Sequence, residues 1–74
     1  MNDVYKQLID TITPLCKTDE EIKGIPVYVR SDKYRKEMID YIETAKNNKD
    51  IITADQLLLL AIKMSNQEKE EGLR

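Results

Sequence analysis

The sequence predicts a mostly α-helical fold with one short strand, in which a strand-helix-helix core follows an N-terminal helical extension and pairs into an intertwined homodimer. Two segments carry this prediction. In residues 25–30, β-forming residues alternate with other residues, and residues 57–62 are apolar without interruption. A lone strand leaves backbone groups unpaired, and a helix that is apolar all round must be buried, so both segments favour a second copy of the chain.

The size and composition of the chain limit what can stabilise it. Its 74 residues make one domain, whose core supplies only about 3–5 kcal/mol unless disulfides, a metal or another subunit contribute. Cys16 is the only cysteine and there is no histidine, which excludes an internal disulfide and a structural zinc site. The first residues do not resemble a secretory signal, so we expect a reduced, cytoplasmic location.

Residues 1–24 form the predicted helical extension. Apolar residues recur at three- and four-residue spacing from Val4 to Cys16, which predicts an amphipathic helix. Pro14 disfavours helical geometry in the residue before it, so the regular helix should end or kink near Ile12. Cys16 lies on the apolar side and is interpreted as a small core residue rather than as a reactive thiol.

The next segment is the predicted strand. Thr18 and Glu21 match a capping box that opens one short helical turn, which Gly24 should end. Residues 25–30 then alternate strong β formers with other residues, and Pro26 confines them to a strand edge or a strand beginning. The inward face is Ile25, Val27 and Val29, and the outward face is Pro26, Tyr28 and Arg30.

Two helices complete the predicted core. Ser31 and Asp32 suit the start of a helix over residues 33–46, which ends in a turn at residues 47–50 because asparagine tolerates left-handed geometry. The second of these helices follows the turn and is the central helix of the predicted fold.

Thr53 and Gln56 form the second capping box and open this central helix. Its apolar run at residues 57–62 is far shorter than the roughly 18 residues of a membrane span, so it belongs in a protein core. The helix should fray after Met64, and residues 65–74 make a polar tail.

Charge and motifs exclude several functions. The net charge of −2 argues against a general polyanion binder. Without histidine or a glycine-rich phosphate loop, no catalytic constellation is present, so we expect no enzyme and no cofactor. Carboxylates that recur on one helix suggest a metal-binding face, but lysines one turn away favour ion pairs instead, so no metal is expected. The carboxylates are Glu37, Asp40 and Glu43, and the lysines are Lys33, Lys36 and Lys46.

The order of elements over residues 25–64 resembles the ribbon-helix-helix family of dimeric DNA-binding repressors. The resemblance implies that two strands pair across the dimer and enter the major groove of double-stranded DNA. Carried over, Tyr28 and Arg30 would read bases, and the amides near Thr53 and Ala54 would hold the phosphate backbone. Arginine is well suited to guanine edges, and a helix N-terminus attracts phosphate.

The resulting hypothesis is a small dimeric DNA-binding transcription regulator. Its one basic cluster is Arg30, Lys33, Arg35 and Lys36, of which Lys33 and Lys36 should contact phosphates. The predicted dimer core is Val27, Val29, Leu57, Leu58 and Ala61. The alternative is a helical protein-protein interaction module, a regulator or inhibitor of a partner protein that does not bind DNA. In that case the basic cluster is a solvated helix start.

Overall fold

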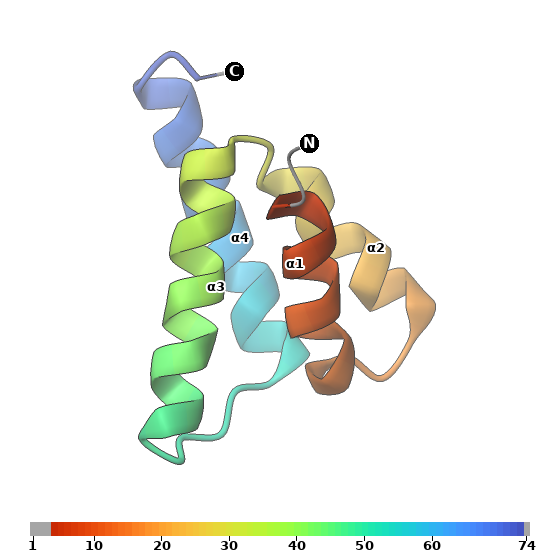
Figure 1. Cartoon of the computed structure of the whole chain (residues 1–74). Coiled ribbons are helices and arrows are strands. Elements are labelled where there is room, and N and C mark those ends of the chain that lie inside the picture. Colours follow the sequence, from red (N-terminus) through yellow and green to blue (C-terminus); the bar gives the residue numbers. More distant parts are fainter. Residues whose placement is uncertain (1–3, 74) are drawn as a thin grey trace.

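The structure, a computed structural model, describes residues 4–73, which form four α-helices and one short 3₁₀ helix (Figure 1). The chain reverses direction between successive α-helices, so α2 and α4 run the same way. The elements are α1 (Val4–Ile12), η1 (Thr13–Leu15), α2 (Asp19–Tyr28), α3 (Asp32–Asn47) and α4 (Ala54–Glu70).

The predicted fold class is wrong. Residues 4–73 contain no strand, and residues 25–28, predicted as β, complete α2. The intersubunit ribbon therefore has no strand to form it, and the element order behind the ribbon-helix-helix resemblance is not present. Gly24 does not end the helix, because it lies inside α2 and its φ is not in the left-handed region.

Packing explains why this segment is helical. Ile25 and Val29 are four positions apart, and both are buried, so a helical turn directs them to the same side. The alternating pattern fits a strand equally well, and β propensity depends on the surface against which a segment packs. Pro26 lies inside α2 at the cost of one backbone hydrogen bond, and the helix ends two residues later at Tyr28.

The predicted starts of α2, α3 and α4 are confirmed, whereas the start predicted at Asn2 and Asp3 lies outside the described residues. Thr18 accepts from the Glu21 amide and Thr53 accepts from the Gln56 amide, and each forms a complete capping box. Ser31 caps α3 by accepting from Tyr34. The turn after α3 differs in detail, because Lys49 takes the positive φ of 61° that was expected of an asparagine.

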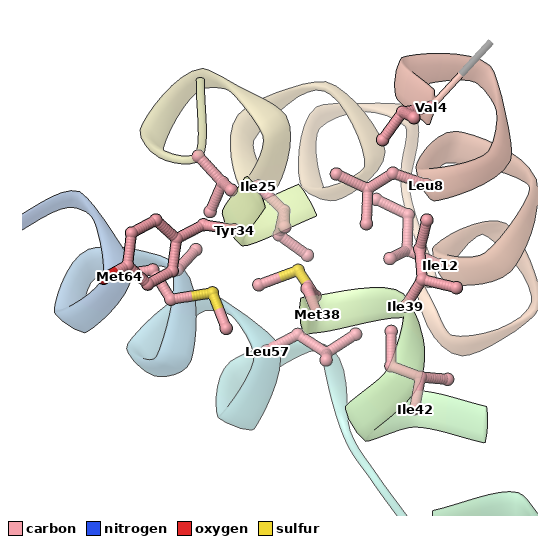
Figure 2. Close-up of a cluster of buried hydrophobic side chains, with 12 residues drawn as sticks. Val4, Leu8, Ile12, Ile25, Tyr34, Met38, Ile39, Ile42, Leu57 and Met64 are labelled. Carbon is pink, nitrogen blue, oxygen red and sulfur yellow. The ribbon is translucent and has the colours of Figure 1, made fainter. Parts of the chain in front are cut away.

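One hydrophobic core joins all four α-helices (Figure 2). Helix α1 packs mainly on α3, and α2 packs mainly on α4. The N-terminal helical segment therefore contributes Val4, Leu8 and Ile12 to this core. Burial of each large side chain stabilises the fold by about 1.5–3 kcal/mol. Those with almost no exposed surface include Leu8, Ile12, Ile25, Met38, Ile42 and Leu57.

Helix α4 is longer than the sequence suggested. It continues through Glu70, and Ser65 and Glu68 are buried although they lie in the predicted polar tail. Glu68 stands four positions after Met64 and seven after Ala61, so it continues their buried side. The expected fraying after Met64 is not seen.

Candidate functional site

The outer side of α4 leaves large apolar side chains in solvent. Leu59 is 69% exposed, and Leu58 and Ile62 are each 37% exposed. Because Ile62 follows the other two by three and four positions, they share one side of the helix, which we call the α4 apolar face. Leu57 and Ala61 on the other side are fully buried. Within one chain, α4 is therefore not buried on all sides as expected.

A hollow of about 370 Å³ lies between α2 and α4 beside this face. Gly24 lies in its wall, and a Cβ added there would meet no atom within 4 Å. The carboxyl-bearing residues Glu20, Glu21 and Asp55 line it, and no lysine or arginine of residues 4–73 does. We call it the acidic hollow. Its lining is Thr18, Glu20, Glu21, Gly24, Ile25, Ala54, Asp55 and Leu58.

A second hollow of about 370 Å³ lies on the other side of α2, toward α1 and the start of α3. Lys23, Arg30 and Arg35 line it, and its lining within the described chain includes no carboxylate. Exposed apolar surface is also present, because Val27 is 57% exposed. We call it the basic hollow. Its lining is Tyr5, Lys23, Pro26, Val27, Arg30 and Arg35.

Arg35 is held in place from three directions. Its Nε donates to the carbonyl oxygen of Val29 at 3.0 Å, and its guanidinium carbon lies 5.0 Å from the centre of the Tyr5 ring. Its Nη1 lies 3.7 Å from Asp32 Oδ1. A guanidinium that stacks on an aromatic ring and donates to a carbonyl is fixed in orientation. Arg35 therefore joins α1, the α2–α3 loop and α3.

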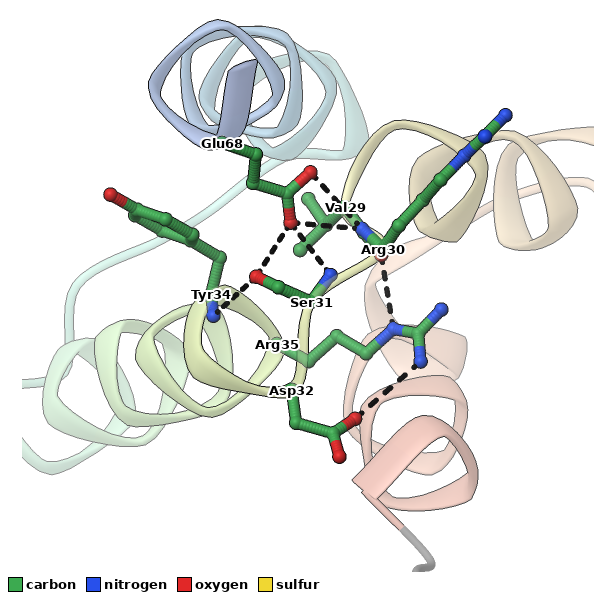
Figure 3. Close-up of polar contacts among 7 residues, drawn as sticks. All are labelled: Val29, Arg30, Ser31, Asp32, Tyr34, Arg35 and Glu68. Atoms are coloured by element: carbon green, nitrogen blue, oxygen red, sulfur yellow. Dashed lines mark hydrogen bonds and ion pairs between the residues drawn. The ribbon is translucent and has the colours of Figure 1, made fainter. Parts of the chain in front are cut away.

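Glu68 fixes the α2–α3 loop to α4 (Figure 3). Its carboxylate accepts from the backbone amide of Arg30 at 3.0 Å, and from the amide and hydroxyl of Ser31 at 2.7 Å each. The side chain is fully buried. A carboxylate is stabilised at the N-terminus of a helix, here α3, because the amide groups there carry partial positive charge.

A polar cluster joins the start of α3 to the end of α4. Lys33 Nζ donates to Glu71 Oε1 at 2.7 Å, and the Tyr34 hydroxyl donates to the same carboxylate. The hydrogen bond from Lys33 and then that from Tyr34 lower the pKa of Glu71. The hydrogen bond to Glu71 is also the main cause that raises the pKa of Lys33 and of Tyr34. Lys33 thus pairs with α4, whereas an ion pair within its own helix was expected.

The structure separates the residues expected to contact DNA. Tyr28 ends α2 at 38% exposure, and Arg30 lies in the following loop. Thr53 and Ala54 open α4, whereas Lys33 contacts Glu71 just beyond the other end of that helix. A helix of 17 residues is about 25 Å long, so the two groups of expected phosphate contacts lie at opposite ends of α4. Like Lys33, Lys36 is exposed on α3.

The residues expected in a dimer core divide into two groups. Val29, Leu57 and Ala61 are fully buried within a single chain, so they already have a role in its own core. Val27 is exposed in the basic hollow, and Leu58 belongs to the α4 apolar face. These two remain accessible to another molecule.

Cys16 packs against the core, as its place on the apolar side of the segment predicts. Partial burial, followed by the nearby charge of Glu21, raises the pKa of its thiol, which disfavours the reactive thiolate at neutral pH. In the described part of the chain, no group of three or more acidic, cysteine or histidine residues is placed to hold a metal ion.

Sequence reasoning missed most of what shapes the two hollows. Arg35 was recognised only as part of a basic run, and Tyr5 and Lys23 were not singled out. Nothing in the sequence indicates that Tyr5 meets Arg35, because the two are 30 positions apart. The burial of Glu68 did leave a signal, namely its spacing after Ala61 and Met64.

No protein-family model, curated protein or solved structure matches the chain. Function is therefore inferred from the two hollows and the α4 apolar face. Among residues 4–73, no helix is both long enough and apolar enough to cross a membrane.

Proposed function

We propose that the chain is a non-enzymatic protein-interaction module, which regulates or inhibits a partner protein by binding one of its helices. The α4 apolar face supports this proposal most directly. Leu59 exposes 69% of its surface in the middle of a helix whose inner side packs in the core. Contiguous exposed apolar patches on small proteins often mark interaction sites.

The shape and charge of the surface specify the kind of partner. Apolar side chains at three- and four-residue spacing, beside a hollow, suit an amphipathic helix that lays its apolar side into the groove. Glu20, Glu21 and Asp55 give the rim its negative charge, and Glu21 is also fixed in place by the Lys17 and Thr18 amides. A partner helix with lysine or arginine along one edge complements that rim.

A second copy of the chain is the second candidate partner. Asp55 stands seven positions before Ile62, and Lys69 stands seven positions after it. Two α4 helices that cross antiparallel at Ile62 would therefore place each Asp55 near the Lys69 of the other copy. This observation favours the predicted homodimer, now formed through helices rather than through a ribbon.

The predicted DNA-binding regulator stays a prediction. Its ribbon requires a strand, whereas residues 25–28 are helical, so the geometry that assigned bases to Tyr28 and Arg30 no longer supports it. The cytoplasmic location also stays an expectation.

Site-specific photo-crosslinking in the host cell tests the proposal. A photoreactive residue at position 59 should capture one defined protein, whose mass is then identified. The same residue at position 41 is the control, because Tyr41 is also an exposed apolar residue, at 51%, but lies on α3. Equal capture at both positions, or no capture at position 59, would contradict the proposal. An adduct of twice the chain mass would identify the second copy as the partner.

Competition with purified variants gives the matched control. Unlabelled parent chain should suppress the adduct, whereas Leu59→Glu should not. Gly24→Gln should also fail to compete, because it fills the acidic hollow. That variant should fold, since nothing lies within 4 Å of the new Cβ and replacement of a glycine inside a helix is favourable. Full competition by both variants would place the contact elsewhere.

A further inference from the structure

The basic hollow concentrates positive charge on a chain whose net charge is −2. Lys23, Arg30 and Arg35 line one concave surface, with Pro26 and Val27 beside them. A hollow that presents charges of one sign beside apolar walls focuses the electric field and attracts a ligand of the opposite sign. Over the described residues, this hollow has the opposite character to the acidic hollow on the other side of α2.

The side chain of Arg35 is preorganised for such a ligand. Its Nε is occupied by the Val29 carbonyl and one face of its guanidinium by Tyr5, so little side-chain freedom is left to lose on binding. The contact with Asp32, at 3.7 Å, is long beside the 2.7 Å contact between Lys33 and Glu71. The charge of Arg35 is therefore only partly offset.

The other two cations of the hollow have even less compensation. The ion pairs found within residues 4–73 involve Lys33 and Arg35, and neither Lys23 nor Arg30 takes part in one. Arg30 Nε donates to the Val27 carbonyl at 3.3 Å. Figure 3 shows the Arg30 side chain extending away from Glu68, which binds its backbone amide instead.

We propose that the basic hollow binds an anionic side chain, a phosphoserine or a carboxylate, in a peptide segment of another protein. The planar guanidinium groups of Arg30 and Arg35 suit phosphate and carboxylate oxygens. Exposed Val27 and the Tyr5 ring offer a surface for an apolar residue next to the anion. This site lies on the other side of α2 from the α4 apolar face and does not rest on the function proposed for that face.

A peptide suits the hollow better than a nucleic acid does. Duplex DNA carries one negative charge about every 1.7 Å along its axis, so it needs cations well beyond one hollow. The exposed group beside Arg35 is a carboxylate instead, that of Asp32. A short segment with one anionic group and one apolar neighbour requires only the residues that line the hollow.

Fluorescence anisotropy with short labelled peptides tests the proposal. The peptides are identical except for a central phosphoserine, glutamate or serine, which leucines flank. A further phosphoserine peptide has glycines in place of leucines. We expect the leucine-flanked phosphoserine peptide to bind most tightly, the glutamate peptide less tightly, and the serine peptide roughly tenfold or more weakly than the first. Added salt should weaken binding.

Variants locate the binding site. Lys23→Gln with Arg30→Gln should weaken phosphoserine-peptide binding roughly tenfold or more, while the fold is kept, because Glu68 holds the backbone and not the side chain of Arg30. Lys46→Gln with Lys63→Gln removes the same charge from exposed positions outside the hollow and should have little effect. Bound peptide should shift the amide NMR signals of Lys23 and Val27.

Three results would overturn the proposal. These are equal binding of the serine and phosphoserine peptides, equal losses in the two double variants, and no binding of any peptide at low salt. Tighter binding of a short labelled DNA duplex than of every peptide would assign the hollow to nucleic acid instead. Inorganic phosphate as a competitor measures how much of the affinity comes from the anion alone. The glycine-flanked phosphoserine peptide should bind more weakly than the leucine-flanked one, because it lacks the apolar contacts.

Discussion

The two sides of α2 carry hollows of equal volume and opposite charge. Glu20, Glu21 and Asp55 set the charge toward α4, whereas Lys23, Arg30 and Arg35 set it toward α1 and α3. Lys23 and Gly24 are neighbours in the sequence, yet they line different hollows. One short helix can serve two surfaces because successive residues point in directions about 100° apart.

The hollows also differ in how firmly the residues around them are fixed. Hydrogen bonds from Arg35 to Val29 and from the Arg30 and Ser31 amides to Glu68 fix the frame of the basic hollow. The acidic hollow borders the α4 apolar face at Leu58, where apolar surface meets water. The basic hollow is therefore suited to recognition of charge, which salt weakens, and the α4 apolar face to burial of area, which salt affects little.

The largest expected effect is a difference in folding between substitutions on the inner side and on the outer side of α4. Ala61→Glu should abolish folding, because position 61 is fully buried and an unpaired charge there costs several kcal/mol, as much as a domain of this size has in total. Leu59→Glu should fold like the parent, because Leu59 is mostly exposed. Circular dichroism of both variants is the measurement. A folded Ala61→Glu variant would mean that α4 is placed incorrectly.

A smaller loss of stability is expected when Glu68, which fixes the loop beside the basic hollow, is replaced. Glu68→Ala leaves the Arg30 and Ser31 amides without their buried acceptor, which should lower the free energy of unfolding by about 2–4 kcal/mol. Glu68→Gln keeps one acceptor oxygen and should lose less. Urea denaturation measures both variants, with exposed Glu70→Ala as a nearly silent control on the same helix. Equal stabilities of all three variants would contradict the proposed role of Glu68.

The helix starts could be predicted from the sequence because their causes are local. Each cap at Thr18, Ser31 and Thr53 needs only a donor and an acceptor three positions apart. Residues 25–30 could not be assigned in this way. The same apolar residues fit the repeat of a strand and that of a helix, and only packing on α4 and the rest of the core distinguishes the two.

The two hollows depend on contacts that join distant parts of the chain. Tyr5 meets Arg35, and Glu68 meets Ser31 across 37 positions, so local patterns give no sign of either contact. The apolar run at residues 57–62 was recognised as the main feature of the chain, but its exposure was not. Uninterrupted apolar sequence does not indicate which side of a helix the fold leaves uncovered, and here that side carries the proposed interaction surface.

The smallest expected effect concerns Lys33, which is paired with Glu71, whereas Lys23 and Arg30 have no ion pair within residues 4–73. Hydrogen bonds from Lys33 and Tyr34 lower the pKa of Glu71 below its ordinary value of 4.5. Stability from a group with a lowered folded-state pKa is present above the unfolded-state pKa and is lost as pH falls through the folded-state pKa. Because the pair is exposed and solvent screens it, Glu71→Gln should be only slightly less stable than the parent at neutral pH.

Urea denaturation of parent and Glu71→Gln across pH tests this assignment. The difference in their free energies of unfolding should disappear in acid, once Glu71 of the parent is protonated. It should also shrink in strong alkali, because the pKa values of Lys33 and Tyr34 are raised and their stabilising contributions are lost as pH rises through those folded-state values. The variant should bind the phosphoserine peptide about as well as the parent does, since Lys33 does not line the basic hollow. A marked gain in affinity would show that the release of Lys33 from Glu71 adds a cation to the site, and that the basic surface extends along α3.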